Sequence, residues 1–133
     1  GFAQYFSGQC YLAPVSTAQV KIFNVTFEPG CRNNWHIHEA DKGGGQILIC
    51  VAGRGYYQEW GKEPQELHPG DVINIMPGVK HWHGAAPDSW FSHLAVEVPG
   101  ENCRSQWCEP VSEEEYGGMA TNKNEATKLG KNI

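Results

Sequence analysis

The chain contains no long apolar run. None of its 133 residues belongs to a stretch approaching the roughly 18 consecutive apolar residues that a membrane-spanning helix requires. No N-terminal segment shows basic residues followed by an apolar stretch, which is the pattern of a secretory signal peptide, although a leader removed before Gly1 stays open. We therefore expect no membrane partner.

Positive charge is scarce and scattered. Lys and Arg total 10 against 15 Asp and Glu, which gives a formal net charge of −5. Domains that bind nucleic acid carry a basic patch or stripe, and basic segments are also what anionic lipid surfaces attract. No such patch is present, so we expect no nucleic-acid partner and predict that the partner is a small molecule.

The cysteines do not suggest a disulfide framework. The chain has 5 of them, at positions 10, 31, 50, 103 and 108, with no Cys-x-x-Cys motif. An odd number argues against a closed set of pairs, and the apolar surroundings of Cys50 are typical of a buried thiol that packs as a small apolar side chain. A reducing compartment is the natural setting for such a protein, which predicts a cytoplasmic location.

Glycine and proline, in contrast, are frequent. The 16 glycines and 8 prolines separate short β-branched and aromatic runs, which is typical of an all-β barrel or sandwich. Strands are predicted at residues 20–28, 32–38, 46–52, 56–60, 66–68, 71–75, 80–84 and 91–97. We predict one domain with an N-terminal arm (1–19), a barrel (20–111) and a C-terminal segment (112–133). A capping-box pattern at Ser112 predicts a short helix there, followed by a polar tail.

Two His-x-His pairs carry most of the functional information. They are His36-Ile37-His38 and His81-Trp82-His83, and each lies in a predicted strand. Residues i and i+2 of a strand point to the same side, so both imidazoles of a pair can converge on one ion. The same alternation turns Trp82 away from the predicted metal cavity.

The spacing around these pairs resembles the two motifs of the cupin superfamily, Gx5HxH…(E/Q)x6G and Gx5PxGxxH. The first motif is matched from Gly30 through the first histidine pair to Gln46 and Gly53, and the second from Gly70 to His81. The likeness spans roughly residues 18–116. It is strongest toward small single-domain cupins associated with carboxymuconolactone decarboxylases and toward manganese-dependent hydroxynitrile lyases of cupin type.

This resemblance implies a jelly-roll β-barrel with one divalent transition metal (Mn, Fe, Ni or Zn). The implied ligands are His36, His38, Gln46 and His81. His83 and His93 would face the ion without binding it, and in the lyases these two histidines carry out proton chemistry. Exchange of N-terminal arms within a homodimer is common among cupins, so a homodimer is expected.

The chain departs from the pattern of these relatives at three places. Met76 replaces a proline, Ala85 replaces an asparagine, and seven residues separate His38 from Gln46, which is more than in the lyases. The third difference lengthens a loop that is expected to border the pocket and to influence what enters it.

The sequence allows a second role for several of these residues. If Gln46 only caps a loop, Glu39 or Asp41 becomes the oxygen ligand, and His83 is either a fifth ligand or a donor behind the ligands. His93 also fits a hydrogen-bonded core histidine. Two further expectations concern residues around the site: Phe91 shares the face of His93 and could line the pocket, while His68 lies beside a turn and is expected to face solvent.

Three imidazoles and one amide leave open positions on an octahedral ion, so substrate can reach the metal. We predict a metal-dependent enzyme of the lyase, decarboxylase or isomerase type. It would act on a small hydroxy or carbonyl compound, with the metal as Lewis acid and two histidines as proton shuttles. The alternatives are an iron-dependent dioxygenase and a non-catalytic protein that binds a metal or a small ligand.

Overall fold

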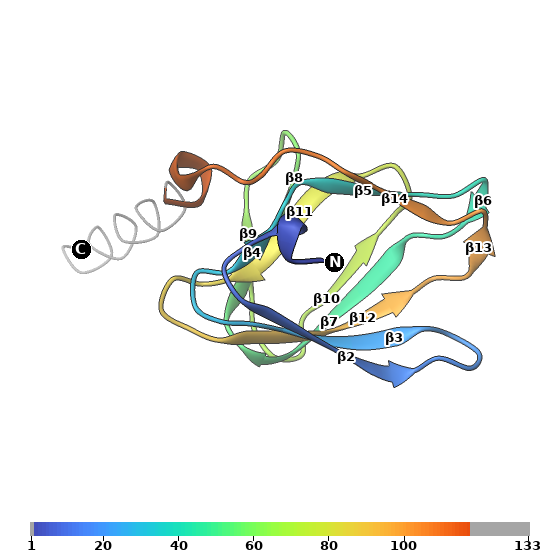
Figure 1. Cartoon of the computed structure of the whole chain (residues 1–133), viewed down its shortest axis with the longest axis horizontal. Coiled ribbons are helices and arrows are strands. Elements are labelled where there is room, and N and C mark those ends of the chain that lie inside the picture. Colours follow the sequence, from blue (N-terminus) through green and yellow to red (C-terminus); the bar gives the residue numbers. More distant parts are fainter. Residues whose placement is uncertain (1, 118–133) are drawn as a thin grey trace, which may run out of the picture.

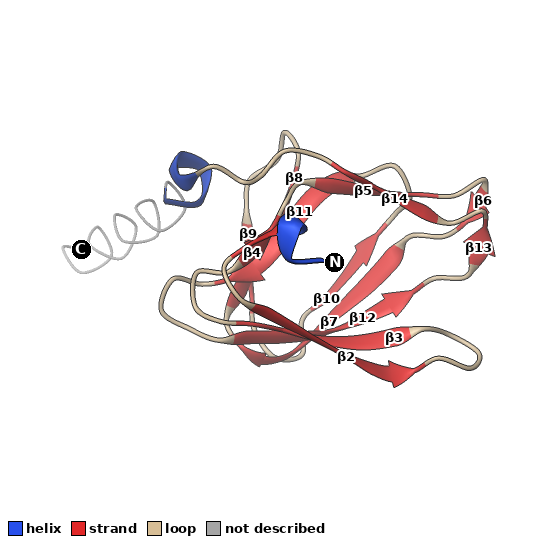
Figure 2. Cartoon of the chain, in the orientation of Figure 1, coloured by secondary structure: helices blue, strands red, loops and turns tan. Residues whose placement is uncertain are grey.

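Two antiparallel sheets face each other and form the body of the molecule (Figure 1). The computed structural model describes residues 2–117. Within this range, strands account for almost all of the regular structure, as Figure 2 shows. The all-β jelly-roll prediction is confirmed. No helical segment among these residues has the length and hydropathy needed to cross a lipid bilayer.

Each sheet collects strands that are distant in sequence. The larger sheet contains seven strands: β1 (Phe6–Ser7), β4 (Arg32–Asn33), β5 (His36–Glu39), β8 (Gly55–Glu59), β9 (Gln65–Leu67), β11 (Lys80–Ala85) and β14 (Arg104–Trp107). The smaller sheet has the order β10-β7-β12-β3-β2. Its strands are β2 (Cys10–Ser16), β3 (Ile22–Phe27), β7 (Gln46–Gly53), β10 (Val72–Ile75) and β12 (Phe91–Glu97).

The core between the sheets follows from the alternation along the central strands. Every second side chain at the start of β7 is buried, and β12 shows the same pattern. Leu48, Cys50 and Phe91 from these strands pack with Val25 and Phe27 of β3. The predicted burial of Cys50 is confirmed, and all five cysteines are free thiols.

A second apolar cluster lies apart from this core. Trp82 of β11 is fully buried there with Trp35, Tyr56, Val111 and Tyr116. The indole of Trp82 therefore points away from the imidazoles on either side of it, as predicted. The segment after β14 supplies Val111 and Tyr116, so the C-terminal part of the described chain covers this face of the sheet.

The predicted capping box is present. Ser112 Oγ accepts a hydrogen bond from the Glu115 backbone N–H, and Glu115 Oε1 accepts one from the Ser112 N–H, both at 3.0 Å. Helical residues 113–117 follow this cap. The polar tail predicted after residue 117 lies outside the described residues.

Residues 2–19, part of the predicted N-terminal arm, contain a 3-10 helix and two strands. A 3-10 helix, η1 (Phe2–Tyr5), is followed by β1, which pairs with β4, and by β2, which pairs with β3 of the same chain. Strand β2 forms one edge of the smaller sheet.

Two other segments differ from the predicted elements. The strand expected over 32–38 is divided into β4 and β5, because the backbone N–H of Asn34 bonds to the Tyr5 carbonyl and that of Trp35 bonds to the Glu109 carbonyl. The glycine-rich segment expected to be a loop contains β6 (Lys42–Gly43), which pairs with β13 (Gly100–Glu101).

Replacing Trp82 with Ala should lower the free energy of unfolding by about 3–5 kcal/mol, the usual cost of truncating a fully buried aromatic side chain. The substitution also removes the hydrogen bond from the Trp82 indole N–H to Gln58 Oε1. Urea denaturation followed by far-UV circular dichroism measures the change. Trp90→Ala is the matched control, because Trp90 is exposed and stacks only on Tyr11 among the described aromatic rings. An equal decrease in the free energy of unfolding in the two variants would contradict the burial of Trp82 in the second apolar cluster.

Candidate metal centre

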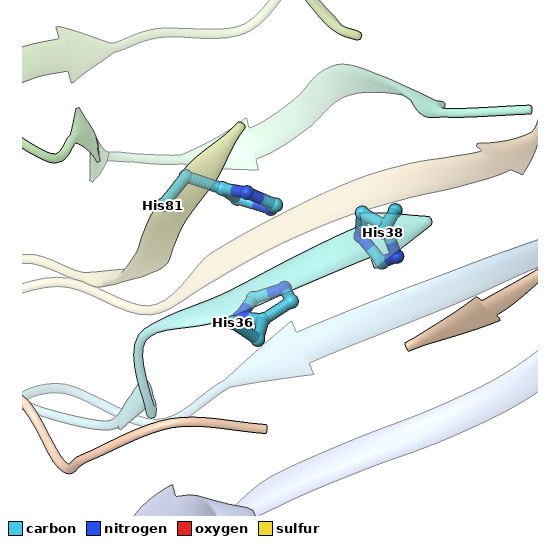
Figure 3. Close-up of side chains that lie close together, drawn as sticks. All are labelled: His36, His38 and His81. Atoms are coloured by element: carbon cyan, nitrogen blue, oxygen red, sulfur yellow. The ribbon is translucent and has the colours of Figure 1, made fainter. Parts of the chain in front are cut away.

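Three imidazoles converge at the inner face of the larger sheet. His36 and His38 lie on β5, and His81 on the adjacent antiparallel strand β11 is the direct cross-strand partner of His36. Their nearest ligand nitrogens all lie within 4.8 Å of one another. Figure 3 shows the three rings gathered on one side of these two strands. The predicted convergence of the first pair with His81 is confirmed.

Backbone carbonyls orient two of these rings. His36 Nδ1 lies 2.8 Å from the Asn34 carbonyl oxygen, and His81 Nδ1 lies 3.0 Å from that of Val79. Because a carbonyl can only accept a hydrogen bond, each Nδ1 must carry the proton, which leaves the lone pair on Nε2.

The third ring has a hydroxyl partner. His38 Nδ1 lies 3.2 Å from Ser105 Oγ on β14. The Nε2 atoms of His38 and His81 are buried and have no hydrogen-bond partner among the described residues. Buried polar atoms are nearly always paired, so two orphaned nitrogens beside a third imidazole are what a bound cation would explain.

Gln46 lines the same cavity as His36 and His38. It is the first residue of β7 and is 8% exposed. Its Oε1 is buried and has no hydrogen-bond partner among residues 2–117, while its Nε2 donates a hydrogen bond of 2.8 Å to Glu97 Oε1. The preceding Gly45 has φ +94°, and a Cβ there would lie 2.5 Å from the Ile75 carbonyl oxygen, so the chain can enter β7 at this angle only with glycine.

The alternative oxygen donors are engaged elsewhere. Glu39 Oε2 lies 3.5 Å from Arg104 Nε, and Asp41 Oδ1 lies 3.2 Å from Arg104 Nη1. Neither carboxylate lines the cavity that His36, His38 and Gln46 line. The ligand role of Gln46 stays a prediction. Three imidazole nitrogens with one amide oxygen form a donor set that suits a mid-row divalent ion. The residues present therefore fit the divalent transition metal that the cupin resemblance implies.

His83 and His93 lie next to this triad. The His83 ring centroid is 5.6 Å from that of His36, and the His93 ring lies perpendicular to His83 with centroids 4.8 Å apart. Asn33 holds His83 through its Oδ1, which accepts a hydrogen bond from the His83 backbone N–H, and its Nδ2, which lies 3.1 Å from His83 Nε2. Both ring nitrogens of His93 are buried and have no hydrogen-bond partner within the described part of the chain.

Burial keeps these imidazoles uncharged. Desolvation lowers the pKa of His81 and of His93 to about 4 and places the pKa values of His36 and His83 well below the usual range. The pKa of His38 is also lowered, mainly by burial. A neutral imidazole offers a lone pair, which an ion or a substrate proton can use.

A cavity of about 310 Å³ is lined by four of these five imidazoles, and His81 does not belong to its lining. Its polar lining consists of Asn33, His36, His38, Gln46, His83, His93, Glu97 and Ser105. Its apolar lining consists of Phe6, Leu12, Pro14, Phe23, Val25, Ala95 and Trp107. No Lys or Arg among residues 2–117 belongs to this lining. Phe91 does not line the cavity, since it packs beneath His93 in the core, and His68 is exposed, as expected.

Residues 23–96 match the family model described as the cupin domain, which covers more than half of the chain. The chain belongs to the cupin family. This cupin is 42% identical over 120 residues to an (R)-mandelonitrile lyase of Granulicella tundricola, a match that covers 87% of this chain and 88% of that protein. These findings confirm the resemblance inferred from the motifs.

Solved structures agree with this assignment. A crystal structure of a cupin-like protein from Thermotoga maritima superposes with a TM-score of 0.75 at 37% identity, covering 87% of this chain and 88% of that one. A protein with a double-stranded β-helix domain from Klebsiella pneumoniae shows the same fold, with a TM-score of 0.64 at 21% identity, covering 77% of this chain and 87% of that one.

The sequence analysis did not identify two residues of the site, Glu97 and Asn33. Glu97 lies four residues after His93 on the alternating strand β12, so the period of two could have placed it on the same inner face. Asn33 gave no such signal, because the chain bends between β4 and β5 and its contact with His83 joins strands 50 residues apart.

Replacing His81 with Ala should reduce the divalent metal content of the cupin to a small fraction of an equivalent, because the substitution removes one of three converging imidazoles. Protein prepared without a histidine tag and analysed by inductively coupled plasma mass spectrometry provides the measurement. His68→Ala removes an exposed histidine and should keep the wild-type metal content. Full metal occupancy in the His81→Ala variant would show that the ion binds elsewhere.

Proposed function

We propose that this cupin is a metal-dependent lyase that cleaves the carbon–carbon bond beside a hydroxyl group in a small neutral compound, such as a cyanohydrin. The main support is the placement of His83 and His93, two buried imidazoles that lie beside the triad in an apolar cavity. The name of the relative at 42% identity, an (R)-mandelonitrile lyase, supports the same reaction class.

His36, His38 and His81, with Gln46 as the proposed fourth ligand, would hold the ion. When bound, a divalent ion supplies Lewis-acid chemistry that makes a substrate hydroxyl more acidic. The protein's own contribution is to fix the orientation of the ligands. The carbonyls of Asn34 and Val79 set the protonated side of two imidazoles and so leave their lone pairs on Nε2, where an ion can bind.

The two remaining histidines account for the proton movement. A neutral imidazole of the His83 and His93 pair accepts the hydroxyl proton as the carbonyl double bond forms. The carbon–carbon bond breaks with its electron pair on the departing cyanide, which then takes up a proton from the pair. The products are an aldehyde and hydrogen cyanide, and the histidines return to their initial state. Both rings are neutral near pH 7 because burial lowers their pKa values, so either can act as the base.

The cavity favours an uncharged substrate with an apolar body. Its seven apolar lining residues offer contact surface, and none of its described lining residues is Lys or Arg. A volume of about 310 Å³ lies at the lower end of the range typical of small-molecule sites.

The reaction can be tested with metal-loaded protein and a panel of aromatic and aliphatic cyanohydrins, with small hydroxy and keto acids for comparison. We expect aldehyde release from the cyanohydrins. His83→Ala and His93→Ala should each reduce kcat by about 10²–10⁴-fold while metal content is retained, because each removes a proton-transfer group. Stopped assays with chromatographic detection of the aldehyde give the rates.

His68→Ala again serves as the control and should keep the full rate. Activity that persists in both His83→Ala and His93→Ala would contradict the proton-transfer roles. Turnover that disappears under anaerobic conditions would contradict the lyase and favour an oxygenase instead.

We also propose that the chain forms a homodimer in which a second copy covers strand β2. Tyr11, Leu12 and Val15 on this edge strand are exposed, with Val15 at 58%. An edge strand with exposed apolar side chains tends to pair with another chain unless it is protected. Leu12 also lines the cavity, so a second copy at this edge would help to close the site from water.

Light scattering after size-exclusion chromatography should give twice the chain mass of 14.7 kDa. Val15→Glu should shift the mass toward the monomer, since it places a charge in the contact. Val72→Glu alters the opposite edge of the same sheet, where Val72 is similarly exposed, and should leave the dimer intact. A monomeric wild-type protein at micromolar concentration would refute this assembly.

A further inference from the structure

We propose that Glu97 is a positioning residue of the metal centre: its carboxylate holds the Gln46 amide so that Oε1 faces the three imidazoles. This inference rests on the metal centre described above and on the proposed ligand role of Gln46. It does not depend on which reaction the cupin performs.

The backbone places these two side chains together. Glu97 of β12 and Gln46 of β7 are direct cross-strand partners in an antiparallel pair. Side chains at such positions have Cβ atoms about 4.5–5.5 Å apart and stand on the same face of the sheet. Glu97 also shares its face with His93 and Ala95, both of which line the cavity. The contact that results is the hydrogen bond of 2.8 Å from Gln46 Nε2 to Glu97 Oε1.

The chemistry of the two groups fixes the direction of the amide. A carboxylate has no proton to donate, so it can only accept, and the NH₂ end of Gln46 must be the end that faces Glu97. The carbonyl end is then turned away from Glu97, and Gln46 Oε1 is buried with no hydrogen-bond partner among the residues that the structure describes. If the carboxylate were removed, the Gln46 amide could rotate and turn its NH₂ group toward the three imidazoles. The positive end of the amide dipole would then repel a bound cation.

Glu97 has no competing role among residues 2–117. It is half-buried and forms no ion pair with Lys or Arg in this part of the chain, in contrast to Glu39 and Asp41, which both contact Arg104. Its carboxylate is therefore free to accept the hydrogen bond from the Gln46 amide.

Zn²⁺ binding to the metal-free protein, measured by competition with a chromophoric chelator and without substrate, tests this role. Glu97→Leu should raise the Kd for Zn²⁺ by about 10–100-fold, the usual effect of removing a group that orients a metal ligand. Glu97→Gln has nearly the same size and should give a smaller increase, because its amide oxygen can still accept the hydrogen bond but no longer enforces one orientation. Glu63→Gln makes the same charge change at an exposed position and should leave the Kd unchanged.

A double-mutant cycle separates positioning from a general effect on the fold. If Glu97 acts through the Gln46 amide, Glu97→Leu should change the Kd by less than about 3-fold once Gln46 has been replaced with Ala. The three imidazoles remain in that background, so Zn²⁺ binding stays measurable.

Two results would overturn the inference. One is a wild-type Kd in Glu97→Leu, and the other is a loss of equal size with and without Gln46. Urea denaturation of each metal-free variant shows whether the fold is kept, and Glu97→Gln supplies the comparison if Glu97→Leu does not fold. Because no substrate is present, a failed lyase assay would leave this result unaffected.

Discussion

The pairing of β5 with β11 is the constraint on which the site depends. Antiparallel register places His81 directly opposite His36, and the period of two along β5 adds His38 on the same face. A slip of one residue would turn His81 away and bring Trp82 toward the cavity. The register is therefore the physical condition for a metal centre made from segments more than forty residues apart in sequence.

Because side chains alternate along β11, one face of this strand carries imidazoles and the other carries an apolar indole. His81 belongs to the triad and His83 lines the cavity, while Trp82 between them is fully buried in the cluster formed with Tyr116. Apolar packing on the outer face stabilises the strand, and this leaves the inner face free to carry buried polar groups. Burying an imidazole without a hydrogen-bond partner lowers the stability of the fold. The apolar packing on the other side of the strand offsets part of this cost in free energy.

The sequence was sufficient for the features that depend on local periodicity. The His-x-His spacing predicts which side chains share a face, and the glycine and proline punctuation predicts short strands. Glycine at position 45 before Gln46 fits the turn into β7. The capping box at Ser112 also depends on neighbouring residues, and the structure confirms it.

What the sequence could not provide depends on contacts between distant segments. The break between β4 and β5 arises because the backbones of Asn34 and Trp35 bond to Tyr5 and Glu109, partners that no local pattern identifies. The Asn33 contact with His83 and the Glu97 contact with Gln46 likewise join separate strands. Such contacts require the register of the sheets, which a single sequence does not determine.

The central claim is that one divalent ion binds among three imidazoles that arrive from two strands. Crystallographic anomalous scattering from Zn²⁺-loaded protein, recorded on both sides of the zinc absorption edge, tests this claim most directly. The account predicts one strong anomalous peak about 2.0–2.1 Å from the Nε2 atoms of His36, His38 and His81. A peak located away from these three nitrogens, or no peak within the cavity at full zinc loading, would contradict it.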